Sequence, residues 1–323
     1  MEGKVKDPNE EKVVLNKALT LSLAPHIRSS DSTRKIMLDV IIALVPAMIG
    51  SIYFFGINAL ILILVSVASA VISEFFIQKL FKKDLLIGDL SAVVTGILLA
   101  FNLPANAPWW VAVFGSFFAI IIVKEFFGGI GSNFMNPALA ARAVLVASWP
   151  SIMATYTTPD GITSATPLAL IKGGSGVAEL PTLARMFIGD IGGSLGETSA
   201  LLLLIGAAYL IIKKVIDWKI PVFYIATTVV MLLLFGVNTD LMIYHILGGG
   251  LLLGAFFMAT DYSTTPITPK GRVIFAIGCG ILTVLIRVKG SMPEGVSYSI
   301  LLMNILTPII ERFTKPKVFG EVK

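Results

Sequence analysis

Residues 160–166, Asp-Gly-Ile-Thr-Ser-Ala-Thr, combine hydroxyl side chains with small neighbours and one carboxylate. A threonine hydroxyl can be esterified to a phosphate when it lies on exposed, flexible chain that a modifying enzyme can reach. Ser164 and Ala165 leave room for such a group beside Thr166, and Asp160 can orient the approaching chain or a metal-bound nucleotide. The other hydroxyl in the stretch is that of Thr163. The alternative is a surface loop rich in Ser, Thr and Gly that has no chemical role.

Arg142 is a second candidate because it falls inside an apolar segment. A cation within a membrane span is costly and is usually paired or functional. Arg142 can therefore neutralise a bound anionic cofactor or a carboxylate partner. Alternatively, it lies close to the membrane interface and extends its head group to water.

Asn133 and Asn136 follow a glycine-rich segment, 128–132, just before the same span. Asn136-Pro137 is typical of a helix start, with Asn as the N-cap and Pro in the first turn. A glycine-rich approach also resembles a re-entrant segment, which is tolerated where it lines a protein-enclosed cavity. Free N–H groups at such a helix start would suit an anionic or electron-rich ligand.

The remaining polar residues in or near the apolar segments indicate a functional site less strongly. Carboxylates near span ends are suitable ligands for a sodium pathway, but they also commonly mark where a span ends; these are Glu74, Asp89, Glu125, Glu197 and Asp261. His245 is the only histidine within a span, which argues against a bis-histidine haem. The single cysteine, Cys279, cannot hold an iron–sulfur cluster, and we expect a small buried residue there, with a metal shared across a subunit interface as the alternative. We predict no metal site.

The composition indicates an integral membrane protein. Of 323 residues, 56% are hydrophobic and 14% charged, with a mean hydropathy of +0.88, whereas soluble domains are about 45–50% apolar and about a quarter charged. The net charge of +5 is no sign of nucleic-acid binding, because membrane proteins carry excess Lys and Arg at the cytoplasmic ends of their spans. We therefore expect one all-α, polytopic membrane domain with a short soluble head and no cleavable signal peptide.

About ten spans are expected from runs of roughly 20 apolar residues, some of them shorter. Their ranges are 37–54, 57–78, 88–103, 109–127, 136–150, 197–212, 220–236, 240–258, 272–288 and 295–312. The corresponding regions are a head (1–36), a first five-helix repeat (37–150), a loop (151–196), a second five-helix repeat (197–313) and a tail (314–323). Because five is odd, the two repeats would be inverted. Met135-Asn136 and Met303-Asn304 are a faint sign of that repeat, and chance similarity remains an alternative.

The distribution of positive charge predicts the orientation in the membrane. With both termini in the cytoplasm, cytoplasmic segments carry about 20 of the 25 Lys and Arg residues, as the positive-inside rule requires. Only Lys172, Arg185, Arg287 and Lys289 would face outward. The loop that contains Thr166 would also lie on the outer side.

The loop sequence resembles the Asp-x-x-(Ser/Thr)-(Gly/Ser)-Ala-Thr pattern of flavinylated proteins, with Ser164 where many relatives have Gly. Nearly the whole chain is similar to the NqrB/RnfD family of membrane subunits. Besides 160–167, the similarity rests on the segments 24–28, 131–138, 258–262, 264–266 and 299–304. The short head favours an RnfD-type over an NqrB-type member.

The resemblance implies a urea-transporter-like bundle and flavin mononucleotide (FMN) joined to Thr166 by a phosphoester bond. It implies a membrane electron-transfer subunit, without a complete active site of its own, in an ion-translocating ferredoxin:NAD oxidoreductase complex of the prokaryotic cell membrane. The implied partners are a flavin-carrying G subunit, a membrane iron–sulfur A/E pair, a C subunit and a flavin transferase for maturation. A second, non-covalent flavin, riboflavin, is known in the NqrB relative, and the resemblance leaves it open here.

Two other functions remain as alternatives. One is an NqrB-type subunit of a sodium-pumping NADH:quinone reductase. The other is a solute channel or transporter with no redox role. The choice between Na⁺ and H⁺ and the direction of electron flow do not follow from the residues.

Overall fold

The computed structural model describes residues 31–83, 85–174 and 180–316, which are mostly helical. Contacts divide the chain into two units, Met1–Thr33 and Arg34–Lys323. The segment 24–28 and most of the expected head and tail lie outside the described residues.

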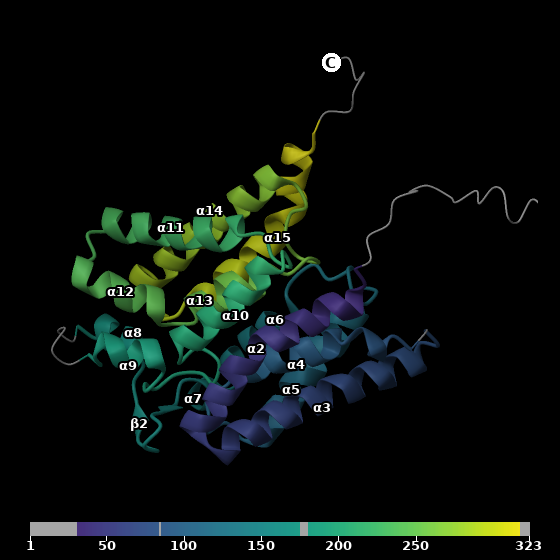
Figure 1. Ribbon diagram of the computed structural model, residues 1–323, viewed down its shortest axis with the longest axis horizontal. Helices are drawn as coiled ribbons and strands as arrows, with labels where there is room; N and C mark the ends of the chain where they lie inside the picture. The colour runs from purple at the N-terminus through teal and green to yellow at the C-terminus, as the bar shows by residue number, and fades with distance from the viewer. Residues whose placement is uncertain (1–30, 84, 175–179, 317–323) are drawn as a thin grey trace, which may run out of the picture. The chain divides into compact units, whose positions relative to one another are not determined.

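The helices of the first half precede a central segment with a small hairpin, and a second helical half follows (Figure 1). The first half contains α2 (Thr33–Phe55), α3 (Ile57–Leu80), the 3₁₀ turn η1 (Ile87–Asp89), α4 (Ser91–Phe101), α5 (Trp109–Phe117), the π-helical η2 (Phe118–Glu125) and α6 (Pro137–Ser148). The central segment contains α7 (Pro150–Met153), β1 (Tyr156–Thr157), β2 (Thr163–Ser164), α8 (Pro167–Lys172) and α9 (Leu183–Ile188). The second half contains α10 (Ala200–Ile212), α11 (Lys219–Leu234), α12 (Thr239–Leu247), α13 (Leu251–Leu253), the π-helical η4 (Gly254–Met258), α14 (Pro269–Val288) and α15 (Val296–Thr314).

Helical segments overlap each of the ten expected spans, but few are long enough to cross a membrane alone. Within the described residues, four helices have that length and apolar character: α2, α3, α14 and α15. A fifth span is obtained if α12 and the segment 251–258 are counted together, although they are bent by 56°. Other apolar helices are shorter, namely α4, α6, α10 and α11. A helical membrane protein is confirmed, whereas ten spans, the inverted repeat and the urea-transporter-like bundle stay predictions.

Each half has its own packed helices, and small residues allow close contacts between the halves. In the first half α3 packs against α4 and α5, and in the second half α14 packs against α11 and α15. The halves meet where α6 contacts α15. A Cβ atom added to Gly206 of α10 would lie 2.0 Å from the carbonyl oxygen of Ala43 on α2. Only glycine permits this approach, which is a common form of helix packing in membranes.

Local sequence explains where several helices begin. The Asn136 side chain accepts hydrogen bonds from the N–H groups of Ala138 (3.1 Å) and Leu139 (3.2 Å), so the predicted N-cap of α6 is confirmed. Thr268 caps α14 in the same way by accepting from Gly271 N–H over 3.1 Å. In both helices a proline in the first turn follows the cap, where its missing N–H costs nothing.

The expected continuous span 240–258 is broken at three glycines, 248–250. Gly249 and Gly250 have φ angles of +63° and +68°, which other residues rarely adopt. The break frees carbonyl groups at the end of α12, and Arg287 donates to three of them, His245 O, Gly248 O (3.3 Å) and Gly249 O (3.1 Å). Arg287, predicted to lie at the outward end of the span 272–288, is buried at 3% exposure on α14, because these carbonyls replace water around its guanidinium.

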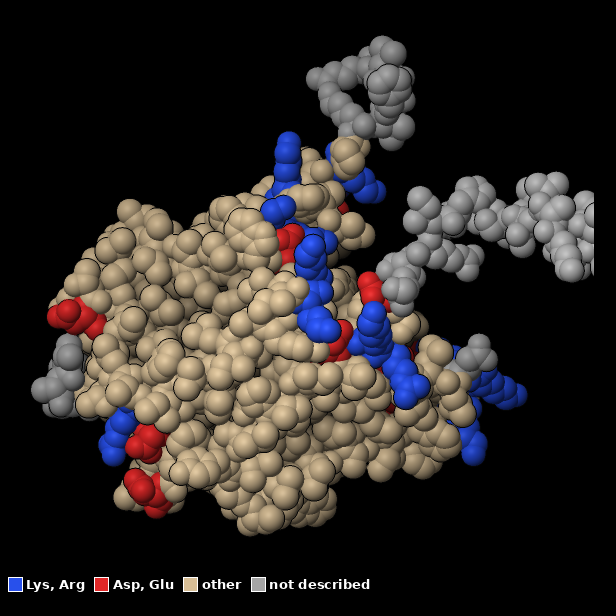
Figure 2. Space-filling model, in the orientation of Figure 1, with Lys and Arg blue, Asp and Glu red and all other residues tan. Residues whose placement is uncertain are grey.

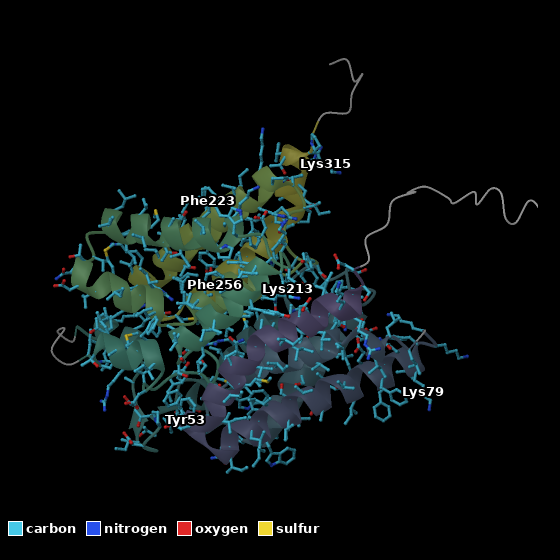
Figure 3. The ribbon with its side chains drawn as sticks, in the orientation of Figure 1. Tyr53, Lys79, Lys213, Phe223, Phe256 and Lys315 are labelled. Atoms are coloured by element: carbon cyan, nitrogen blue, oxygen red, sulfur yellow. The ribbon has the colours of Figure 1, made fainter. Side chains whose placement is uncertain are left out.

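The basic side chains lie mainly toward one side of the view. Figure 2 shows Lys and Arg gathered mostly toward the right, whereas α8, α9 and β2 lie at the left in Figure 1. Figure 3 places Tyr53 near the left and Lys79 near the right, at opposite ends of the helix pair α2–α3. Lys124, near the end of the expected span 109–127, is buried and ion-paired with Glu74.

Candidate functional site

The loop predicted to carry chemistry begins as a two-stranded hairpin. Strands β1 and β2 are antiparallel, with Tyr156 opposite Ser164 and Thr157 opposite Thr163. Asp160 lies in the exposed turn between them. The hairpin therefore fixes the backbone up to two residues before Thr166 and holds Asp160 and Thr163 in exposed positions.

Thr166 is the N-cap of α8. The prediction that it lies on exposed, flexible chain is wrong. Its Oγ1 atom accepts a hydrogen bond from Ala169 N–H over 3.3 Å, and the residue is only 5% exposed. The physical reason is in the sequence Thr166-Pro167, a capping residue followed by a proline in the first turn, as in α14. Ala165, immediately before it, is exposed.

Thr166 lines a cavity of about 270 Å³ that opens to the surface. This volume is close to the lower end of the roughly 300–1,000 Å³ range of ligand pockets. The cavity is bounded by α6, α7, the segment 165–169 and the segment before α15. Its polar or aromatic lining comes from Arg142, Tyr156, Thr166, Glu294, Ser297 and Tyr298, with Ala165, Val146, Met153, Ala169 and Met292 among the apolar lining residues.

Arg142 and Glu294 form a buried ion pair in this cavity. The Arg142 side chain is 7% exposed and that of Glu294 is 20% exposed. Arg142 also donates to Asn102 Oδ1 over 2.7 Å, and the Tyr156 hydroxyl donates to the other Glu294 oxygen over 2.9 Å. Burial and then the nearby Glu294 carboxylate raise the pKa of Tyr156 well above its usual value, so the phenol stays protonated as a donor. The pair thus connects a membrane helix, α6, with the hairpin.

The structure brings together some of the predicted site residues and separates others. Thr166, Ala165 and Arg142 line one cavity, although Arg142 precedes Thr166 by a whole loop. Asp160, Thr163 and Ser164 are absent from its lining. The expected carboxylate partner of Arg142 is confirmed as Glu294, whereas its role toward a flavin and its depth in the membrane stay predictions.

Glu294 and its hydrogen-bond donor Tyr156 are site residues that were not predicted from the sequence. Glu294 lies between α14 and α15, and 152 residues separate it from Arg142. The available signal was indirect: a buried arginine needs an anion, and Glu294 is a carboxylate that immediately precedes a span.

Asn133 and Asn136 line a second, smaller cavity, as the cavity-lining hypothesis predicted. Its volume is about 90 Å³, and Phe256, labelled in Figure 3, contributes to its apolar wall. The Oδ1 atom of Asn133 is buried without a hydrogen-bond partner among the described residues.

The carboxylates near span ends mostly have local partners. Asp89 accepts from Ser91 N–H, Glu197 from Ser194 N–H and Asp261 from Ser263 N–H, while Glu74 pairs with Lys124 and Glu125 with Lys83. These contacts agree with the interpretation that the carboxylates mark span ends rather than a sodium pathway. The described residues contain no group of three or more His, Cys, Asp or Glu side chains placed to hold a metal ion. Cys279 is buried and unpaired.

Comparisons with known proteins extend over almost the whole chain. The model of the NQR2, RnfD, RnfE family matches residues 20–320. The chain is 54% identical to the D subunit of the Na(+)-translocating ferredoxin:NAD(+) oxidoreductase complex of Acetobacterium woodii, covering 94% of this chain and 96% of the relative. It is 45% identical to the D subunit of the proton-translocating ferredoxin:NAD(+) oxidoreductase complex of Clostridium ljungdahlii, with 93% and 96% coverage. It is also 40% identical to the D subunit of the ion-translocating oxidoreductase complex of Stutzerimonas stutzeri, covering 91% of this chain and 93% of the relative.

Proposed function

The chain belongs to the NQR2, RnfD, RnfE family, and on this premise we propose that it is the D-type membrane subunit of an ion-translocating ferredoxin:NAD oxidoreductase complex. The supporting relatives are named as D subunits of such complexes and match over more than nine-tenths of their length. Their names divide between Na⁺ and H⁺, so the translocated ion is left open.

The proposed contribution of this subunit is an FMN group esterified to Thr166. The observation that carries the proposal is that Thr166 and the buried cation Arg142 line the same cavity. A threonine beside a pocket near ligand size, with a cation to balance the phosphate or the ring, fits a tethered flavin. When bound, the flavin would supply the electron-carrying chemistry, and the protein would supply position and electrostatics.

Each lining group has a separate task in this proposal. Thr166 anchors the phosphate, and α8 fixes where the anchor lies. Arg142 balances negative charge, while Tyr156 holds the Glu294 carboxylate beside it. The apolar wall, including Met153, limits access of water to the pocket.

The partners and orientation are proposed together. The sequence has no dinucleotide fingerprint and a single cysteine, so NAD and ferredoxin would be handled by other subunits, including the G subunit, the A/E pair and the C subunit. The gathering of Lys and Arg on one side (Figure 2) supports cytoplasmic termini and an outward-facing flavin loop. An outer flavin transferase would attach the FMN.

The test is flavin attachment to the full-length chain, expressed in a host that contains a flavin transferase. The denatured chain should fluoresce in a gel under ultraviolet light, and the peptide containing Thr166 should gain the mass of FMN minus water. Thr166→Asn should lose both signals while it keeps a capping side chain. The matched control is Thr182→Asn, because Thr182 caps α9 in the same central segment; its flavin signal should be unchanged.

The outcome separates the alternatives. Absence of flavin from the wild-type chain, with the transferase active on another substrate, would leave the channel or transporter function. A flavinylated chain whose assembled complex reduces quinone rather than NAD would instead support the NqrB-type function.

The second cavity does not accommodate a riboflavin as it stands. Its volume of about 90 Å³ is far below the roughly 300 Å³ minimum of ligand pockets. The unpartnered Asn133 Oδ1 is a suitable acceptor for a small polar ligand. The non-covalent flavin therefore stays a prediction.

A further inference from the structure

We propose that Glu294 holds the reduction potential of the Thr166-bound flavin low by neutralising Arg142, so that the Arg142–Glu294 pair is the potential-setting element of this site. This inference rests on the proposed function, because it concerns the flavin on Thr166. It assigns a role to a residue that lies 152 positions from Arg142 in the chain.

Both charges belong to the pocket. Arg142 and Glu294 line the cavity together with Thr166, and both side chains are mostly buried, at 7% and 20% exposure. Charges in a poorly solvated site act over longer distances than charges in water. A flavin in this cavity would therefore respond to both groups.

The two charges act on the reduction potential of a flavin in opposite directions. Reduction adds negative charge to a flavin, so a nearby cation favours the reduced form and raises the potential. An ionised carboxylate next to that cation has the opposite effect. Because Glu294 is paired directly with Arg142, most of the cation's influence is cancelled, and the potential is held low.

Hydrogen bonds fix the Arg142–Glu294 pair in place. Asn102 Oδ1 accepts from Arg142 over 2.7 Å, and Tyr156 donates to Glu294 over 2.9 Å. Asn102 directly follows α4 and Tyr156 belongs to β1, so neither partner is free to turn away. The arrangement is a rigid pair rather than a mobile surface ion pair.

Other charged and titratable groups surround the pair without replacing it. Glu197 and Tyr298 interact with Arg142 electrostatically, and Arg287 interacts with both Glu197 and Glu294. Arg287 is occupied by backbone carbonyls and Glu197 by Ser194 N–H. The direct ion pair of Arg142 is with Glu294.

The experiment measures the midpoint potential of the covalent flavin by spectroelectrochemical titration of the purified full-length chain at fixed pH. Glu294→Gln should raise the potential, because the amide still accepts from Tyr156 but no longer offsets Arg142. Arg142→Gln should lower it, and the double variant should lie closer to the wild type than either single variant. Asp217→Asn is the matched control: it removes a carboxylate from another arginine pair, with Arg272 at 2.9 Å, outside the cavity, and should leave the potential unchanged.

Different results would overturn the role of the Arg142–Glu294 pair and the proposed function. A flavin present on Thr166 with the same potential in wild type, Glu294→Gln and Arg142→Gln would overturn the inference alone. No flavin on the wild-type chain would overturn the proposed function. If Glu294→Gln does not fold, Glu294→Asp draws the carboxylate back from Arg142 and should raise the potential by a smaller amount; no shift would again count against the inference.

Discussion

The backbone N–H of Asn136 donates to the side-chain Oδ1 of Asn304 over 3.2 Å, which ties the start of α6 to the middle of α15. Asn304 also donates from Nδ2 to Thr264 O over 3.1 Å. The residue is 1% exposed, so these groups have no water to replace a lost partner. The contact joins two sequence segments that resemble each other, one from each half of the chain.

Asn304→Leu should therefore destabilise the fold. It removes the partner of Asn136 N–H and one partner of Thr264 O, and an unsatisfied buried group costs about 1–3 kcal/mol. The measurement is thermal unfolding in detergent. Leu302→Ala on the same helix is the control, because Leu302 is 47% exposed; an equal loss in both variants would contradict a specific role for Asn304.

Thr166→Ala should lower stability in a chain that carries no flavin. The N-cap hydrogen bond to Ala169 N–H is lost, which typically costs about 0.5–2 kcal/mol. Thr166→Asn should retain most of the stability because asparagine also caps helices. Hydrogen exchange at the amides of residues 168–172 would report the difference, and equal protection in Thr166→Ala and wild type would show that the cap is unimportant.

Lys172→Met should loosen the contact between α8 and the turn after α14. The Lys172 ammonium donates to three carbonyls, Arg287 O (3.1 Å), Gly290 O (2.6 Å) and Met292 O (2.8 Å), and methionine donates to none. Limited proteolysis should then cut the central segment several-fold faster. Lys289→Met, a loss of charge on the same turn, serves as the control and should leave the cutting rate close to that of the wild type.

Asp217 should contribute stability that is lost in acid. Burial opposes its ionisation, but the hydrogen bond from Lys219 N–H and the Arg272 guanidinium outweigh burial and hold the pKa of Asp217 below its usual value. A carboxyl whose pKa is lower in the folded state stabilises the fold above the unfolded value, about 3.9, and this contribution disappears as pH falls through the folded value. The effect should be within about 1 kcal/mol, since the pair is partly exposed.

The check is the melting temperature of wild type and Asp217→Asn from pH 6 down to pH 3. The two curves should differ most at pH 6 and converge at the acid end. A constant difference across this range would contradict the linkage to Asp217.

Short-range signals predicted the local structure well. Asn136-Pro137 predicted the cap of α6 because both the capping side chain and the amides it serves lie within three residues. The same rule applies to Thr166-Pro167, where it would have predicted a buried cap instead of flexible chain. The glycines at 248–250 likewise carry a visible signal for the break in the span 240–258.

Long-range features did not follow from the sequence. The pairing of Arg142 with Glu294 depends on how α6 meets the segment before α15, and no periodic pattern encodes that contact. Arg287 has the ordinary appearance of a charge at a span end, and only the broken helix beside it explains its burial. The composition indicated a helical membrane protein, but not which helices would be too short to cross alone.

The buried position of Thr166 constrains the order of events during biogenesis. A transferase needs the hydroxyl in the open, whereas the finished fold leaves the residue 5% exposed and engaged with Ala169 N–H. If Thr166 carries FMN, the modification comes before α8 closes over it, or α8 must open transiently. In the first case the anchor acts as a checkpoint in assembly, since a chain in which α8 forms too early can no longer be loaded.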